Sequence, residues 1–225
     1  MKSTFRLIRF GLMVGMGGRC SKYVDIRLGD VVVSQPHQGY GGVIQYDFGK
    51  ATTNGFQRTG FLNSPPQVLL AAVSKMRANH LRGRKKLSDY VSTTSENGRL
   101  AEFARAGAGP DVLFEASYAP IGGSSCEECS KDHLIKRDPR KNSNEVAVHY
   151  GTIASGNQVM RDGEARDNIS KDFGGVLCFE MEAAGLMISF PCLVKLSSSI
   201  VKCLASTINP TRYSASGFDH GQNHE

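Results

Sequence analysis

The chain has 225 residues and a formal net charge of +6, with 40% hydrophobic and 21% charged residues. This composition supplies apolar side chains for a core and argues against wholesale disorder. The length fits one α/β domain or a large part of one. Because no stretch of about 20 apolar residues occurs, we expect no membrane span and a cytoplasmic location.

The first third of the sequence predicts strands followed by a helix. Residues 10–18 (FGLMVGMGG) predict a buried strand that ends in a glycine-rich turn, and residues 28–35 and 41–49 predict two further strands. Residues 64–81 predict a helix with Ser64 as its N-cap and a proline in its first turn. The apolar face of this helix is expected to carry Val68, Leu69, Ala72, Val73 and Met76.

Residues 82–145 lack periodicity and predict an irregular insertion. Two basic clusters fall in it, and we interpret them as solvated loops, because neither has the interleaved aromatic residues or the motif of a nucleic-acid site. The first cluster contains Arg82, Arg84, Lys85 and Lys86, and the second contains Lys131, Lys136, Arg137, Arg140 and Lys141.

The six cysteines give little evidence for a metal site. Cys126 and Cys129 have C-x-x-C spacing, but no second pair or His-x-His cluster accompanies them, and a turn closed by two thiols explains them at least as well. Cys178 and Cys192 lie in apolar runs and are expected to pack in the core. We therefore predict no bound metal and no cofactor.

The second half of the sequence alternates strand and helix patterns. Residues 146–155 predict a strand that runs into a Ser-Gly-Asn turn, residues 162–174 a polar helix, residues 175–179 a strand, residues 180–190 a helix and residues 191–196 a strand. This order is typical of a three-layer α/β/α sandwich with a mixed, mostly parallel sheet. Residues 197–225 show no clear period and predict a poorly ordered tail.

Glu180 and Glu182 flank Met181 directly after the strand predicted at 175–179. They stand at the carboxyl end of that strand and in the first turn of the next helix, where the helix dipole favours negative charge and where α/β sheets bind ligands. On their own, the two residues are explained by helix capping. The glycines at 15–18 and the polar turn at 155–157 are each expected at another strand end, which favours a shared ligand site.

Three segments, GLMVGMGG, IASGNQVM and FEMEAAGLM, resemble the nucleoside phosphorylase and nucleosidase superfamily. The likeness is to the domain found in fungal proteins that join it to NACHT, ankyrin or tetratricopeptide regions, and it runs from about Phe10 to Pro191. The E-M-E motif at its distance from the Ser-Gly-Asn turn is the more specific feature. The resemblance implies cleavage of the bond between a ribose and a nucleobase, with a small-molecule nucleoside as ligand and a homo-oligomer as one expected form.

The resemblance also implies roles for individual residues. Glu182 would bind the 2′- and 3′-hydroxyls of the ribose, Met181 would pack on the sugar, and Glu180 would support the 2′ side. A carboxylate in this position favours the positive charge that develops on the ribose ring. Around the base we expect Phe179, Val159 and Met160, and facing the attacking phosphate or water we expect Gly15, Met16 and Gly17.

The sequence departs from the family at its catalytic groups. Met13 stands where phosphorolytic members carry an arginine, and Met16 stands where they carry a phosphate-contacting Ser or Thr. The general-acid aspartate is replaced at about Ile200, and no aspartate follows until Asp219. General acid–base catalysis contributes roughly 10²–10⁴-fold, so we expect slow cleavage that does not depend on phosphate, and no catalytic residue is assigned.

We therefore expect a partial domain over residues 1–196, incomplete at both ends, with apolar surface exposed at the open edges of its sheet. The favoured function is a purine-type nucleoside phosphorylase-superfamily domain, with phosphate as co-substrate only if the reaction is phosphorolysis. The alternative is a non-catalytic nucleoside- or nucleotide-sensing module of a signalling protein. A zinc- or nucleic-acid-binding protein built on Cys126, Cys129 and the basic loops is a third hypothesis.

Overall fold

The computed structural model describes residues 7–20, 23–53, 55–83, 111–118, 129–140 and 146–199. Within them, one sheet contains β1 (Gly11–Arg19), β2 (Val31–Ser34), β3 (Val43–Gln45), β6 (Val148–Gly151), β7 (Ile153–Ser155), β8 (Cys178–Glu180) and β9 (Cys192–Ser199). The strand order is β3-β7-β8-β1-β9-β2-β6. The pairs β3–β7, β7–β8, β1–β9 and β2–β6 are parallel, whereas β1–β8 and β2–β9 are antiparallel. The expected mixed, mostly parallel sheet is confirmed.

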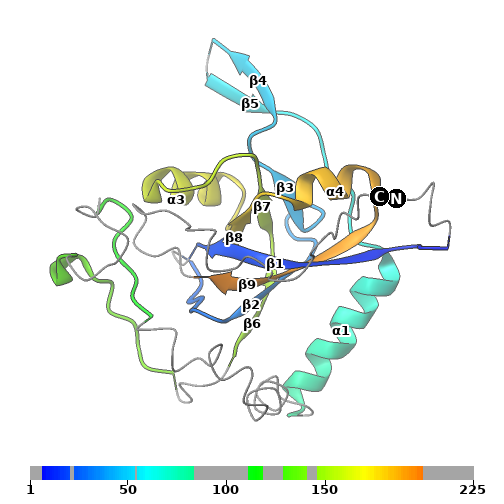
Figure 1. Cartoon of the computed structure of the whole chain (residues 1–225), viewed down its shortest axis with the longest axis horizontal. Coiled ribbons are helices and arrows are strands. Elements are labelled where there is room, and N and C mark those ends of the chain that lie inside the picture. Colours follow the sequence, from blue (N-terminus) through cyan, green and yellow to red (C-terminus); the bar gives the residue numbers. More distant parts are fainter. Residues whose placement is uncertain are drawn as a thin grey trace, which may run out of the picture.

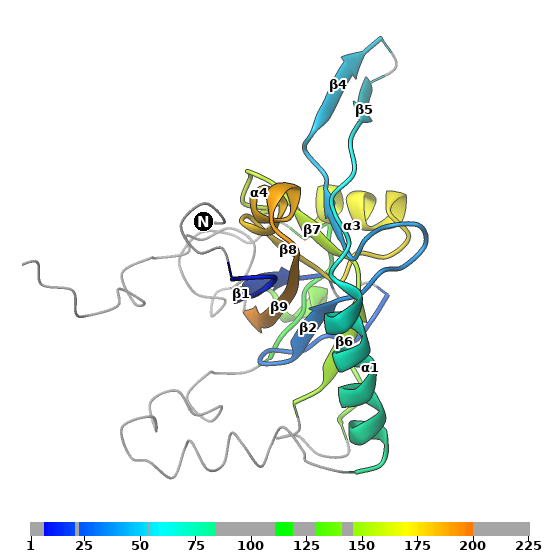
Figure 2. The same cartoon turned by 90° about the vertical axis from the view of Figure 1, so that its right-hand side faces the viewer.

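The sheet curls because one short stretch of chain contributes a strand at one end of the sheet and another strand near the opposite end. The strand predicted over 146–155 is divided at Thr152 into β6 and β7. β6 pairs with β2 at one end of the strand order, while β7 pairs with β3 and β8 near the other. The end strand β6 and the strand β7, which is next to the opposite end, are therefore only one residue apart in sequence, so the sheet bends back on itself (Figures 1 and 2).

The inner face holds the main core. Side chains from five strands meet there with Met187 of the helix α4 (Ala183–Ser189), and they include Val32, Val43, Ile153, Cys178 and Val194. Both Cys178 and Cys192 are fully buried in this cluster, as their apolar surroundings predict. We refer to this group as the inner cluster. Most of its aliphatic members are β-branched, which suits a pleated, buried surface.

Two further helices pack on the opposite face of the sheet. The helix α1 (Gln67–Leu81) places Leu69 and Val73 against Val33 and Leu193. The helix α3 (Gly163–Asp172) and the residue after it pack against Ala154 and Phe179. Successive strand residues point to opposite faces, and Val32 and Ile153 belong to the inner cluster, so α1 and α3 lie on the face away from α4. The predicted three-layer arrangement is confirmed.

Some local predictions were wrong. Ser64 does not cap α1; Pro66 occupies the N-cap position, and no side chain bonds to the first turn. On the expected apolar face of α1, Val68 and Met76 are exposed while Leu69 and Val73 are buried. A hairpin of β4 (Gly49–Thr52) and β5 (Gly55–Arg58), which the sequence did not predict, projects from the body (Figure 2).

The described part of the expected insertion at 82–145 contributes no strand to the sheet. It contains a 3₁₀ turn at Lys131–His133 and an isolated bridge between Phe114 and Leu134. Cys129 is buried, and Cys126 lies outside the described residues. Of the tail expected at 197–225, residues 197–199 belong to β9 and residues 200–225 lie outside the described residues, so the predicted domain boundaries remain predictions.

The second basic cluster is not wholly a solvated loop, contrary to expectation. Arg137 bonds to Asp111 and Asp25, and Arg140 bonds to Asp30, with only 14% and 18% of the two arginine side chains exposed. These ion pairs hold residues 129–140 against the core. Lys131 and Lys136 are exposed as expected, and Arg84, Lys85, Lys86 and Lys141 lie outside the described residues.

Candidate functional site

The carboxyl ends of β3, β7 and β8 form one rim of the sheet. The three strands are parallel and adjacent, with Gln45 opposite Ser155 and Ser155 opposite Glu180. The Gly156 N–H donates to the Glu180 carbonyl at 3.2 Å, which holds the turn after β7 against the end of β8. Ligands of α/β sheets bind at such ends, so we refer to this edge as the carboxyl rim.

Glu180 is the buried carboxylate of the rim, with 6% of its surface exposed. It ends β8 and does not open the helix as the sequence predicted, because it still pairs with Ser155, and α4 begins only at Ala183. Its Oε2 accepts the N–H groups of Glu182 at 2.8 Å and of Ala183 at 2.9 Å. The Glu180 side chain therefore accepts the backbone N–H groups at the start of α4, in agreement with the helix-capping explanation of this residue.

The other carboxylate oxygen of Glu180 does not accept a backbone N–H group in the described part of the chain. Oε1 is buried and has no hydrogen-bond partner among the described residues. Burial raises the pKa of Glu180, and this outweighs the lowering effect of the Ser155 hydroxyl and of the two backbone N–H groups. An unpaired buried acceptor is costly, so a hydroxyl donor from a ligand would stabilise this carboxylate.

Ser155 and Gly17 lie beside Glu180 on the inner side of the rim. The Ser155 hydroxyl oxygen accepts the Ala184 N–H at 2.9 Å, which attaches the end of β7 to the first turn of α4. A Cβ atom added to Gly17 would lie 3.1 Å from the Phe179 carbonyl oxygen, so β1 passes very close to β8 at this point. The structure thus brings together one residue from each of the three segments that the sequence singled out.

The turn at 156–158 is held by two residues that sequence reasoning missed. Asp47 accepts the Asn157 N–H at 2.5 Å, and the Tyr46 hydroxyl donates to the Gln158 carbonyl at 2.9 Å. Gly156 leaves room for Tyr46, because an added Cβ atom would lie only 2.5 Å from its ring. The polar Tyr-Asp pair directly after the strand at 43–45 is the signal that could have identified them.

The predicted glycine turn is wrong. Residues Gly15 to Gly17 lie inside β1, which pairs with β9 without interruption from Gly11 to Gly18. The long parallel partner keeps this segment extended. Gly15 and Gly17 point to the inner side, whereas Met16 points to the opposite face and is 55% exposed. Met13, which stands in the arginine position, packs against the inner cluster.

The remaining predicted residues lie around the rim in different environments. Glu182 is exposed, and its Oε2 accepts the Met181 N–H at 3.1 Å. Met181 and Val159 are also exposed, while Met160 packs partly buried against the cluster that contains Phe179. Phe179 is buried and meets the Tyr46 ring edge-on at 5.6 Å. Their predicted roles in binding a sugar and a base remain predictions.

Other types of site find little support within the described residues. No group of three His, Cys, Asp or Glu side chains there could hold a metal ion. No helix in that part of the chain combines the length and the apolar character needed to cross a bilayer. The expected general-acid position at Ile200 lies outside the described residues.

No family model matches the chain. A nucleotide-binding leucine-rich repeat (NLR)-like protein of Hyaloscypha variabilis is 43% identical to it over 195 residues, which is 86% of this chain. The chain spans only 19% of the length of that relative.

Three solved structures match most of the chain with TM-scores below 0.5. A futalosine hydrolase mutant of Helicobacter pylori strain 26695 gives a TM-score of 0.44 at 17% identity, over 88% of this chain and 61% of its own. Helicobacter pylori MTAN gives 0.46 at 18%, covering 88% and 60% of the two chains. A putative 5′-methylthioadenosine/S-adenosylhomocysteine nucleosidase from Borrelia burgdorferi B31, bound to adenine, gives 0.46 at 15% with the same coverage. The chain is therefore similar in sequence to a segment of an NLR-like protein of Hyaloscypha variabilis.

Proposed function

We propose that this chain is a nucleoside-binding domain of the nucleoside phosphorylase type and that the carboxyl rim holds the ribose. The observation that carries the proposal is the unpaired Oε1 of Glu180, which is buried at the end of β8 beside Ser155. Its partner oxygen is fixed by two backbone N–H groups, so the carboxylate is held in place before a ligand arrives. A ribose hydroxyl is a donor that matches such an acceptor.

Glu182 is the second ribose ligand in this proposal. It is exposed at the N-cap of α4, where its side chain bonds only to near neighbours in sequence, the Met181 N–H and the Glu180 carboxyl group. Its side chain can therefore turn toward a sugar without breaking a tertiary contact. Met181 and Val159, which are also exposed near the rim, would cover the sugar and the base as the motif resemblance implies.

Cleavage of the N-glycosidic bond is proposed only as a slow activity. Met13, which is apolar and packs on the inner cluster, offers no charge to phosphate at the arginine position. Water is therefore the expected nucleophile. Phosphate would be a co-substrate only if the reaction were phosphorolysis. A homo-oligomeric state and a cytoplasmic location are further parts of this proposal.

Nucleoside sensing without cleavage is the second candidate. It is favoured by the sequence relative, which is named as a nucleotide-binding leucine-rich repeat (NLR)-like protein. In that case the rim would bind a nucleoside or nucleotide and report its presence to the rest of a longer protein. The two candidates share the ligand site and differ only in whether free base is released.

The test measures binding and cleavage on the same variants. Binding of inosine, adenosine and uridine is followed by calorimetry, and free base is followed by chromatography with and without phosphate. Glu182→Gln and Glu180→Gln should each weaken binding about tenfold or more, as expected for a lost charge-assisted hydrogen bond. Glu164→Gln, on the exposed first turn of α3, is the matched control and should bind normally.

The outcomes separate the candidates. Slow, phosphate-independent release of base supports the cleaving domain, and binding without release supports the sensing module. Equal nucleoside affinity in wild type, E180Q and E182Q would show that the rim is not the ribose site. Rapid phosphate-dependent release would show that another residue supplies the charge missing at Met13.

A further inference from the structure

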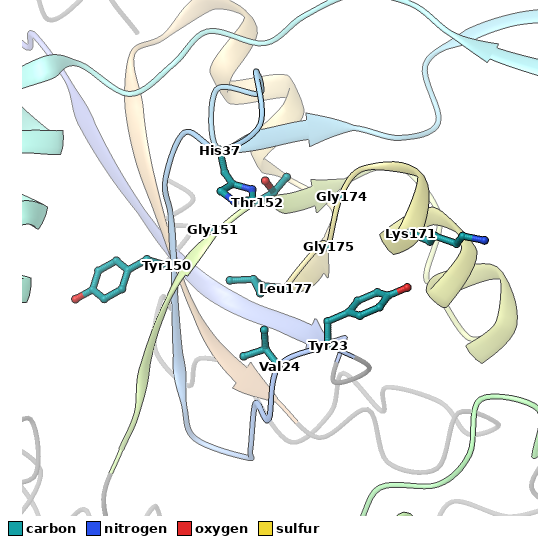
Figure 3. Close-up of a pocket in the computed structure, with 10 residues that line it drawn as sticks. All are labelled: Tyr23, Val24, His37, Tyr150, Gly151, Thr152, Lys171, Gly174, Gly175 and Leu177. Atoms are coloured by element: carbon teal, nitrogen blue, oxygen red, sulfur yellow. The ribbon is translucent and has the colours of Figure 1, made fainter.

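A cavity of about 490 Å³ lies at the other end of the same strands (Figure 3). Its walls include Thr152, directly before β7, and Leu177, directly before β8. It is therefore separate from the carboxyl rim, which contains the last residues of these strands. A volume of this size falls within the range of small-molecule sites.

Most of the cavity wall is apolar. Val24 and Leu177 form part of it together with the ring of Tyr23, and Gly174 and Gly175 follow the end of α3 at its border. Gly175 has a φ of +102°, and an added Cβ atom would meet nothing within 4 Å, so the backbone borders open space there. Such a wall suits a flat, apolar ring.

One buried polar group in the wall has no partner. Thr152 is 1% exposed, and its Oγ1 makes no hydrogen bond among the described residues. Figure 3 shows this hydroxyl on the side of the cavity where His37 lies. A buried hydroxyl without a partner is unfavourable unless something else supplies the bond, and the adjoining cavity is the place from which a ligand could supply it.

The charges around the cavity favour an acidic ligand. Among the described residues, no acidic side chain lines the cavity, whereas His37 and Lys171 both do. Neither of these two side chains makes a hydrogen bond or an ion pair within the described residues, so both remain available to an acceptor. The Lys171 ammonium group points outward in Figure 3, which leaves the buried Thr152 hydroxyl and the exposed His37 imidazole as the two donors at the cavity.

We propose that this cavity binds a small aromatic carboxylate. The ring would lie against Val24, Leu177 and Tyr23, and the carboxylate would accept hydrogen bonds from the Thr152 hydroxyl and the His37 imidazole. The proposal concerns a second site and does not rest on nucleoside binding at the carboxyl rim. Its occupant is defined by an apolar ring and one anionic group.

The experiment uses 2-naphthoate as the probe and follows its fluorescence on titration with the full 225-residue chain. Neutral 2-naphthamide has the same ring system and tests the contribution of the charge. Thr152→Val removes the hydroxyl while keeping the shape of the side chain, and His37→Gln removes the imidazole. The matched control is Thr59→Val, which changes a threonine that does not line the cavity.

We expect 2-naphthoate to bind the wild-type chain. T152V and H37Q should each weaken this binding about tenfold, and T59V should leave it unchanged. The amide should bind more weakly than the acid. Because the Thr152 hydroxyl has no protein partner, T152V should unfold at the same or a higher urea concentration, so that lost binding is not lost folding.

Three results would overturn the proposal. The first is no binding of 2-naphthoate at millimolar concentration, and the second is equal affinity in wild type, T152V and H37Q. The third is loss of binding in E180Q with normal binding in T152V, which would place the probe at the carboxyl rim. Failure of nucleoside binding at the rim, in contrast, leaves this test unaffected, because none of the rim residues lines the cavity.

Discussion

Arg140 and Asp30 form a two-point ion pair that fastens the segment 129–140 to the residue before β2. The two terminal nitrogens of Arg140 donate to the two carboxylate oxygens of Asp30 at 2.8 and 2.6 Å. Asp30 is fully buried and also accepts bonds from the Arg27 and Ala147 N–H groups and lies 3.0 Å from His149 Nε2. Because every oxygen of this carboxylate is used, we interpret it as structural and not as a ligand site.

Asp30→Asn should therefore destabilise the fold strongly. The substitution leaves Arg140 without its charge partner and puts an amide group where donors converge, and breaking a buried pair typically costs about 3–5 kcal/mol. Urea unfolding measures the loss. Asp138→Asn is the control, because that side chain is exposed and only its backbone carbonyl bonds to Arg27. A loss below about 1 kcal/mol in D30N would show that the network is dispensable.

Acid should weaken the wild-type fold through the same carboxylate. Burial alone would raise the pKa of Asp30, but hydrogen bonds from Arg140, His149 and two N–H groups outweigh it and hold the pKa well below its ordinary value. A lowered pKa stabilises the fold above the unfolded-state pKa of about 4, and this stabilisation is lost as pH falls through the native-state pKa. Unfolding free energies measured between pH 7 and pH 2 should fall less steeply in D30N than in wild type.

The sequence predicted the layers of the fold because they depend on apolar periodicity. Leu69 and Val73 in α1 and the runs that became β2, β8 and β9 are buried as their patterns indicate. The curl could not be predicted, since it depends on which strands β6 and β7 choose as partners on either side of Thr152. The anchoring of Arg137 and Arg140 was missed for the same reason, because their acidic partners are more than 20 residues away in sequence.

The candidate site was predicted in part. The spacing of Ser155 and Glu180 placed both at one rim, because a helix and a parallel strand separate them. The glycine turn was misjudged, since glycine permits a turn but does not require one, and the long pairing with β9 keeps residues 15–17 extended. Tyr46 and Asp47 support the rim through tertiary hydrogen bonds; their place directly after a strand marks them in the sequence as rim residues, but it does not reveal their partners.

The contribution of Glu180 to the unfolding free energy should change with pH in the opposite direction to that of Asp30, and Glu180→Gln tests this. Burial raises the pKa of Glu180, so the folded state favours the protonated carboxyl, and its contribution to stability declines as pH rises from the unfolded-state value through the native one. A glutamine keeps an acceptor for the Glu182 and Ala183 N–H groups without a buried charge. The unfolding free energy of E180Q relative to wild type should therefore be higher at pH 7 than at pH 4. A pH-independent difference would contradict the raised pKa.

Ser155→Ala should loosen the junction between β7 and α4. The variant leaves the buried Ala184 N–H without its acceptor, which typically costs about 1–3 kcal/mol. Ser74→Ala, which removes an exposed hydroxyl bonded within α1, should change stability by less than about 0.5 kcal/mol. Urea unfolding compares the two, and hydrogen exchange of the Ala184 amide should quicken only in S155A. Equal behaviour of the two variants would show that the hydroxyl is not needed.

Gly17 and Gly15 should respond differently to alanine. At Gly17 a Cβ atom would lie 3.0 Å from Leu196 Cδ1, 3.1 Å from the Phe179 carbonyl oxygen and 3.2 Å from the Cys178 sulfur. At Gly15 the nearest atom would be Leu196 Cδ2 at 3.4 Å, which is an ordinary contact. G17A should lose about 1–3 kcal/mol on overpacking, whereas G15A should be nearly neutral or stabilised, because alanine reduces the entropy of the unfolded chain. Similar unfolding curves for the two variants would contradict the close approach of β1 to β8.

The outer face of β1 is the expected origin of aggregation. Leu12, Val14 and Met16 alternate along the strand and are 64%, 71% and 55% exposed, so the apolar surface lies on a central strand and not at the sheet edges where the sequence led us to expect it. Val14→Lys places a charge in this row, which should reduce association while changing the unfolding free energy by less than about 0.5 kcal/mol.

Met13→Lys, one residue earlier, is the matched comparison. Met13 packs against the inner cluster, so a lysine there should destabilise the fold by several kcal/mol, as expected for burying an unpaired charge. Light scattering at increasing protein concentration measures association, and urea unfolding measures stability. If V14K unfolds as readily as M13K, then the outer face of β1 is covered in solution. If V14K aggregates as much as wild type, then this row of side chains is not the surface through which the chains associate.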